Sequence, residues 1–167
     1  MSVIANTTII SNFACIGQHN LLRRLYGKLY ISVEVYAEIQ TGLEEGYLFY
    51  ASLEHQIFPI AESGWIHLTS MTDEQEFRLF SGFPSRLHQG EASSLAIACR
   101  RGWLFLTDDL DARTTATQLG IRLSGSLGCL VLAVERQLCS LEQANSWLDQ
   151  MIQEGYRSPV DDLTSLL

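Results

Sequence analysis

The sequence has few basic side chains. Its 11 lysines and arginines are outnumbered by 19 aspartates and glutamates, which gives a net charge of -8 and a pI near 4.9. This balance excludes a broad cationic surface of the kind that holds duplex phosphates. Any nucleic-acid binding must therefore be local, at a bound metal ion or at the few arginines around Arg23, Arg24, Arg100 and Arg101.

Cysteines and long apolar runs are also scarce. The four cysteines are far apart and form no C-x-x-C pair, which favours free thiols in a reducing cytosol. The start, MSVIANTTII, lacks the basic region and cleavage site of a signal peptide, and runs such as LGCLVLAV are too short to cross a bilayer. We expect a soluble, cytoplasmic protein without a membrane segment.

Two common site motifs are missing as well. The four histidines form no H-E-x-x-H or other zinc-ligand spacing. The stretch SGSLG lacks both the G-x-x-x-x-G-K pattern of a phosphate loop and the glycine spacing of a dinucleotide fingerprint, so it reads as a turn from strand to helix. Neither zinc catalysis nor nucleotide-cofactor chemistry is indicated.

The pattern of apolar residues predicts the fold class. With 167 residues and 47% hydrophobic content, we expect a single domain over 1–167. Short apolar segments alternate with helical patterns of roughly 10 to 15 residues, which is typical of a parallel sheet covered on both faces. The predicted architecture is a three-layer α/β/α sandwich around a central, mostly parallel sheet of about four to five strands. The strands are expected within VIANTTII, KLYI, WIHL, WLFLT and IRLSG.

Helix boundaries follow from capping residues. Ser32 is the expected N-cap of the helix VEVYAEIQ, and Gly102 is the expected end of the helix QGEASSLAIACRR. Capping boxes are expected at Thr72 with Gln75 and at Ser140 with Gln143. The segment 42–64 is the least regular, and its spaced apolar residues suit one or two helices.

The stretch FLTDDLDAR places Asp108, Asp109 and Asp111 directly after a predicted buried strand. Crowded carboxylates raise one another's pKa and resist burial, so the cluster needs an explanation. One explanation is a solvated turn that caps the next helix, because acids favour a helix N-terminus. The other is a divalent cation, since Mg²⁺ and Mn²⁺ prefer carboxylate oxygens.

The carboxyl ends of parallel strands gather the candidate site residues. Ligands of open α/β sheets bind there, near the point where the strand order reverses. This rule selects Asn6 after the first strand and both Asp108 and Asp109 after WLFL. Glu38 and Glu91 lie in helices whose side chains can reach the same edge.

Taken together, these residues resemble the PIN-domain nucleases, a family that includes VapC-like toxins of prokaryotic toxin-antitoxin pairs. The resemblance rests on ANTT, VYAEI, GEASSLAIA and TDD in this order, and it covers roughly Val3 to Glu135. It implies a ribonuclease dependent on Mg²⁺ or Mn²⁺, with Asn6, Glu38, Glu91, Asp108 and Asp109 at the metal. It also implies an RNA substrate, an antitoxin partner and a homodimer.

One residue departs from the family pattern. The first acid of the family is normally an aspartate, whereas this chain has Asn6, which keeps a carbonyl oxygen but carries no charge. Three explanations are open: Asp108 and Asp109 compensate, the metal binds more weakly, or the domain no longer cleaves and only binds RNA or a protein partner. A receiver-type α/β domain is a weaker alternative, because the phosphoacceptor aspartate and later lysine of that class have no counterparts here.

Overall fold

The computed structural model describes residues 1–167, and its centre is a sheet of six parallel strands in the order β3-β4-β2-β1-β5-β6. The strands are β1 (Val3–Ala5), β2 (Leu29–Ser32), β3 (Ile57–Phe58), β4 (Ile66–Thr69), β5 (Leu104–Leu106) and β6 (Leu123–Ser124). Five of the six lie in the segments predicted as strands. The sixth, β3, has only two residues and lies in the irregular segment 42–64, where no alternating pattern could reveal it.

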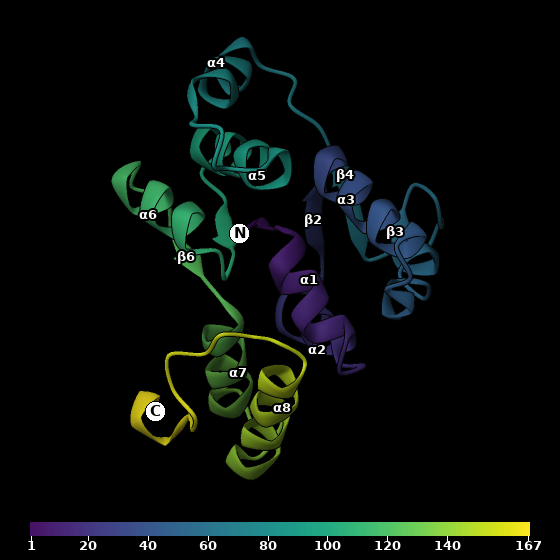
Figure 1. Ribbon diagram of the computed structural model, residues 1–167, viewed down its shortest axis with the longest axis vertical. Helices are drawn as coiled ribbons and strands as arrows, with labels where there is room; N and C mark the ends of the chain where they lie inside the picture. Colours follow the sequence, from purple (N-terminus) through teal and green to yellow (C-terminus); the bar gives the residue numbers. More distant parts are fainter.

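Helices cover both faces of the sheet, as Figure 1 shows. They are α1 (Thr7–Ala14), α2 (His19–Tyr26), α3 (Val33–Glu44), α4 (Glu74–Gly82), α5 (Gln89–Arg101), α6 (Leu110–Gln118), α7 (Ser126–Glu135) and α8 (Leu141–Gln153). Single 3₁₀ turns are η1 (Leu48–Tyr50), η2 (Glu54–Gln56) and η3 (Thr164–Leu166). The predicted α/β/α sandwich is therefore confirmed. No helix is long and apolar enough to cross a membrane.

Two hydrophobic clusters pack against the two faces. Along β1, Val3 and Ala5 belong to the larger cluster, which α1, α2, α3, α7 and α8 complete, whereas Ile4 belongs to the smaller one under α5 and α6. Successive side chains of a strand point to opposite faces, so a strand buried on both faces is apolar at every position. This burial explains why the strands appear in the sequence as continuous apolar runs.

The first strand is shorter than predicted. The segment VIANTTII was expected to be a strand, but β1 ends at Ala5 and α1 begins at Thr7. Ile9, Ile10 and Phe13 are buried at helical spacing. Their burial outweighs the weak helix propensity of β-branched residues, which is a preference of less than about 1 kcal/mol per residue. The turn at Asn6 therefore starts a helix directly at the sheet edge.

The predicted caps are mostly confirmed. The Ser32 hydroxyl accepts the backbone N–H of Val35 at 3.1 Å, and Gly102 ends α5 in the left-handed conformation. Of the capping box predicted at Ser140 and Gln143 only one half forms: the Ser140 hydroxyl accepts the backbone N–H of Gln143 at 3.0 Å, and the Gln143 side chain makes no return bond. The capping box at Thr72 and Gln75 is wrong by one residue. The cap is Asp73 with Glu76, because the Glu76 carboxylate also accepts the N–H groups of Thr72 and Asp73, at 2.9 and 3.0 Å.

Glu76 also forms the one ion pair of the protein with a fully buried member. Its side chain is 1% exposed and accepts Arg101 Nε at 2.8 Å. Arg101 donates further to the Thr69 hydroxyl and to the Ser70 carbonyl, and its guanidinium lies over the Trp103 ring. These contacts lower the pKa of Glu76 despite its burial. They also engage all three guanidinium nitrogens of Arg101 within the fold.

We expect Arg101→Met to lower the free energy of unfolding by about 2 kcal/mol, because the variant leaves a buried carboxylate without its charged partner. Urea denaturation at neutral pH measures this loss. The matched control is Arg78→Met, which removes an exposed pair with Glu74 and should cost less than about 0.5 kcal/mol. Equal losses in the two variants would contradict a structural role for the buried pair.

Candidate functional site

The sheet reverses its strand order between β1 and β5. From β1 the chain builds β2 and β4 on one side and later adds β5 and β6 on the other. Ala5 pairs with Leu106, so the next residues, Asn6 and Thr107, lie side by side at the carboxyl edge. This is the position at which ligands of open α/β sheets bind.

Asn6 is fully buried and holds this edge together. Its amide donates to the Thr107 hydroxyl at 2.7 Å, and its carbonyl oxygen accepts the Thr8 hydroxyl at 2.8 Å. The same two hydroxyls accept the backbone N–H groups of Asp109 and Asp108, at 3.1 and 3.0 Å. Asn6 therefore fixes the backbone of both aspartates through two threonines.

The two aspartates point to different partners. The Asp108 carboxylate accepts the backbone N–H of Ser126 and the amide of Asn12, both at 2.8 Å, and it also accepts the Ser126 hydroxyl. These bonds place Asp108 at the N-terminus of α7, where the helix dipole stabilises its charge. A side chain at Gly125 would meet its Oδ1, so the glycine permits this approach.

Asp109 instead caps α6. Its Oδ2 accepts the backbone N–H of Ala112 at 2.8 Å, and its charge raises the pKa of Glu91. The helix-cap explanation for the aspartate cluster is thus confirmed for this residue, which also faces another acid. Asp111 is exposed, and Arg86 approaches it at 3.7 Å, so it lies on the outer surface of α6.

Glu38 and Glu91 come together across the gap between α3 and α5. The Thr7 hydroxyl donates to Glu38 Oε2 at 3.1 Å, and a side chain at Gly90 would overlap the Glu38 carboxylate. Glu91, in the first turn of α5, is only 8% exposed. The other oxygens, Glu38 Oε1 and Glu91 Oε2, are buried without a hydrogen-bond partner.

An open pocket of about 610 Å³ joins these glutamates. Four glutamates line it, Glu34, Glu38, Glu45 and Glu91, and the exposed side chains of Tyr47 and His88 stand at its rim. Glu34 Oε1 is a third buried oxygen without a partner. The irregular segment 42–64 supplies Tyr47 and Tyr50, so it forms one wall of the pocket as well as part of the core.

Glu38 and Glu91 are the residues that could hold a divalent cation, but they form no preformed cage. No group of three or more histidine, cysteine, aspartate or glutamate side chains is arranged around a common point. Two buried carboxylate oxygens without donors are nevertheless unusual, because burying an unpaired charged group costs several kcal/mol. A cation would satisfy both, and magnesium sites commonly use one or two carboxylates with water as the remaining ligands.

The pKa values of both glutamates are raised. Burial is the main cause for each, the charge of Glu34 adds to it at Glu38, and the charges of Glu38 and Asp109 add to it at Glu91. A raised pKa in the folded state means that these groups stabilise the fold at low pH and lose that contribution as the pH rises through the folded pKa. Negative charge at this edge therefore opposes folding at neutral pH.

We expect Glu91→Gln to raise the free energy of unfolding by about 1 kcal/mol at pH 7 in the presence of a chelator, because the amide cannot ionise. The gain should vanish near pH 3, well below the ordinary glutamate pKa of about 4.3, where the side chain is protonated in both states. Urea titrations of wild type and variant at the two pH values measure the difference. A variant that is less stable than wild type at pH 7 would contradict the raised pKa.

Arg113, the last residue of the stretch FLTDDLDAR, does not pair with an acid; it donates to the Thr107 backbone carbonyl at 2.9 Å. Asn12 and Ser126, which anchor Asp108, were not selected. Ser126 follows β6 at the same edge of the sheet, so the rule that selected Asp108 could have found it. Asn12 is in the middle of a helix and gave no such signal.

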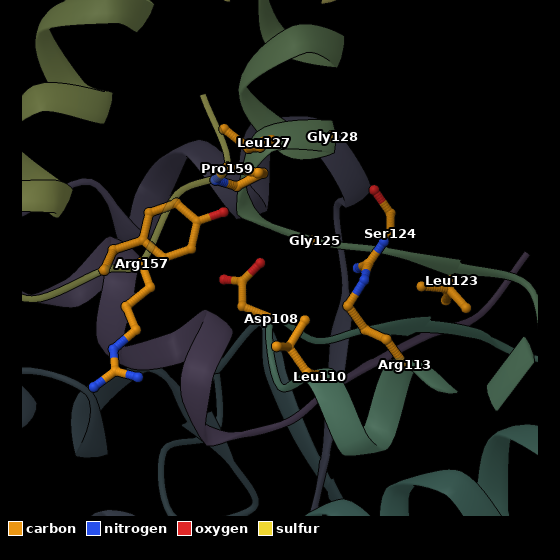
Figure 2. Close-up of a pocket in the computed structure, with 11 residues that line it drawn as sticks. Asp108, Leu110, Arg113, Leu123, Ser124, Gly125, Leu127, Gly128, Arg157 and Pro159 are labelled. Atoms are coloured by element: carbon orange, nitrogen blue, oxygen red, sulfur yellow. The ribbon is translucent and has the colours of Figure 1, made fainter. Parts of the chain in front are cut away.

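A second pocket, of about 280 Å³, lies beside Asp108 (Figure 2). The chain after α8 returns to the sheet edge here, so that Tyr156 and Arg157 line the pocket together with Asp108 and Arg113. Burial raises the pKa of Tyr156, and the nearby charge of Asp108 raises it further. No sequence pattern linked this C-terminal segment to the site.

The fold and the site define a class: an α/β/α domain with acidic side chains at the switch point of a parallel sheet. Residues 2–167 match the DUF3368 family, described as a PIN domain, and the chain belongs to this family. The suspected resemblance to PIN domains is thus confirmed, and with it a nuclease-type fold.

Comparison with solved structures found a similar protein, a PilT N-terminus domain protein from the hyperthermophilic archaeon Sulfolobus solfataricus P2. Its identity is 12% and its TM-score 0.48, over 95% of this chain and 99% of that chain. A comparison with curated proteins gave no match.

Proposed function

We propose that the protein is a metal-dependent ribonuclease that hydrolyses phosphodiester bonds at the carboxylate edge. PIN-domain membership supports a nuclease-type activity, and the observation that carries the proposal is the pair of buried, unpartnered oxygens on Glu38 and Glu91. Water or a protein donor normally satisfies such atoms. A divalent cation within reach of both oxygens would satisfy them and would offset the charge repulsion that adds to the effect of burial on their pKa values.

In this proposal Glu38, Glu91 and Asp109 hold Mg²⁺ or Mn²⁺. When bound, such an ion lowers the pKa of a coordinated water and neutralises charge on the phosphodiester. The chain's own residues position the ligands: Thr7 orients Glu38, and Asn6 fixes the backbone of Asp109 through Thr107. Asp108 contributes by anchoring the N-terminus of α7 next to the site.

The test is cleavage of a mixed-sequence fluorescent RNA by the purified protein in Mg²⁺, in Mn²⁺ and in a chelator. Cleavage with either metal and none in the chelator supports the proposal. The same RNA with 2′-deoxy sugars shows whether the activity requires ribose. An RNA that stays intact at a large excess of protein in both metals would refute the nuclease assignment.

A second candidate function is a silent domain that binds RNA or a protein partner. Asn6 favours it, because a neutral side chain with both polar ends hydrogen-bonded contributes no charge to hold a cation. Mn²⁺ titration separates the two candidates, since a silent domain should show no saturable binding at the acids.

The family resemblance suggests a biological setting for the nuclease. In this setting the protein is the single-domain, cytoplasmic toxin of a prokaryotic toxin-antitoxin pair. The toxin forms a homodimer, and an antitoxin inhibits it. Co-expression with the product of an adjacent gene and analytical ultracentrifugation would test the partner and the oligomeric state.

A further inference from the structure

The cations of this acidic protein are almost all engaged within the fold. Of the 11 lysines and arginines, eight form hydrogen bonds or ion pairs with the protein itself, as Arg101 does with Glu76. The remaining three, Arg23, Arg100 and Arg157, are exposed and have no such partner. The charges of these three arginines have no partner within the protein.

Only Arg157 of these three lies at the candidate site. Arg100 is in the last turn of α5, at the opposite end of the helix from Glu91, and Arg23 is in the last turn of α2. Arg157 instead shares an open pocket of about 390 Å³ with three aspartates, Asp108, Asp109 and Asp111, and Thr8, Ser11 and Asn12 add hydroxyl and amide groups. The pocket therefore joins an unpaired cation to one of the proposed metal ligands.

The segment that carries Arg157 is held in place on both sides. Before it, the Tyr156 backbone N–H bonds the Met151 carbonyl at 2.9 Å, and the ring packs against the larger hydrophobic cluster. After it, Leu163 is fully buried, and its backbone N–H bonds the Asn145 side chain at 2.9 Å. These anchors hold the segment at the sheet edge and leave the Arg157 side chain exposed.

Figure 2 shows Arg157 and Arg113 on opposite sides of Asp108. An N–H group of Arg113 donates to the Thr107 backbone carbonyl, and the other donors of its guanidinium group are free. No ion pair joins Arg157 to a nearby aspartate, so its positive charge is not used within the protein. Guanidinium groups match phosphate oxygens with two parallel hydrogen bonds.

We propose that Arg157 binds a backbone phosphate of single-stranded nucleic acid and directs the neighbouring phosphodiester to the acids. This proposal rests on the proposed function, because that function names the acids as the metal site. Binding of a phosphate by Arg157 does not itself require that the protein cleaves RNA. A single cation suits a flexible single strand, because a duplex would need a row of cations that this surface lacks. Arg157 is thus a substrate-binding residue supplied by the C-terminal segment.

The test is binding of short fluorescein-labelled single strands, RNA and DNA of the same sequence, followed by fluorescence anisotropy in Mg²⁺. Asp109→Asn protein is the background for all variants, so that cleavage does not interfere. We expect Arg157→Ala to weaken binding about 10-fold and to reduce the dependence of log K on log salt by about 0.7, the value for one phosphate contact with a single strand. Arg157→Lys should keep part of the affinity and the full salt dependence.

The matched control is Arg100→Ala, which removes an equally exposed and unpartnered charge far from the acids. Equal losses of affinity in the Arg157 and Arg100 variants would show that only the net charge matters, and would overturn the proposal. Unchanged binding by Arg157→Ala would overturn it as well. A loss confined to RNA would overturn the phosphate assignment in favour of a ribose contact.

The design separates this proposal from the nuclease proposal. If wild type does not cleave RNA but binding depends on Arg157, the nuclease assignment fails and the phosphate contact stands. If wild type cleaves RNA and Arg157→Ala binds and cleaves equally well, the phosphate contact fails and the nuclease assignment stands.

Discussion

Replacing Glu91 with glutamine is expected to reduce manganese-dependent RNA cleavage by about 100-fold or more. Changes to residues that merely orient a metal ligand often cost 10–100-fold, so the loss of a charged ligand should cost at least as much. Glutamine keeps the size of the side chain and removes only the charge. Because Glu91 also destabilises the fold at neutral pH, the variant should be less active and more stable at once.

This opposite change in activity and stability distinguishes a functional acid from a structural one. Initial rates on a fluorescent RNA in Mn²⁺, together with thermal unfolding of the same proteins in a chelator, measure both quantities. Glu44→Gln is the matched control, since Glu44 is an exposed acid at the end of α3 outside the pocket, and it should change neither. Wild-type cleavage by Glu91→Gln would remove this residue from the metal site.

The sequence predicted the fold well because burial leaves a clear periodic pattern. Strands buried on both faces appear as continuous apolar runs, and α5 appears as a long helix that ends at Gly102, whose φ is +67°. Features that depend on only a few residues were harder to predict from the sequence. β3 is too short for any pattern, and β1 was overestimated because Ile9 and Ile10 are β-branched residues that a helix buries.

The sequence predicted which residues meet at the sheet edge but not how their side chains are directed. The position after each parallel strand brought Asn6, Asp108 and Asp109 to one place. The sequence could not show that the two neighbouring aspartate side chains point to different partners, Asp108 to α7 and Asp109 to α6 and Glu91. The direction of each side chain depends on the backbone conformation of the turn. Arg157 is about 50 residues from either aspartate along the chain, so only tertiary packing reveals it.

Asn6→Asp is expected to lower the free energy of unfolding by about 3 kcal/mol at pH 7 in a chelator, and saturating Mn²⁺ should recover most of the loss. The site accepts the shape of aspartate, because the Thr107 hydroxyl can rotate to donate where it now accepts. The cost comes from charge alone, since position 6 is fully buried beside two other aspartates. Thermal unfolding in the chelator and along a Mn²⁺ titration measures both effects.

The metal-induced shift also decides what Asn6 does in the natural protein. A ligand that binds only the folded state stabilises it by about 2.7 kcal/mol at 100 times its Kd, so a tighter site gives a larger shift at the same Mn²⁺ concentration. If wild type shifts and cleaves, the remaining acids suffice and Asn6 serves as the neutral support that fixes Asp108 and Asp109. If only Asn6→Asp shifts and cleaves, the asparagine is what disarms the site. If Asn6→Asp is as stable as wild type in the chelator, the expectation that the new carboxylate is buried and charged is wrong.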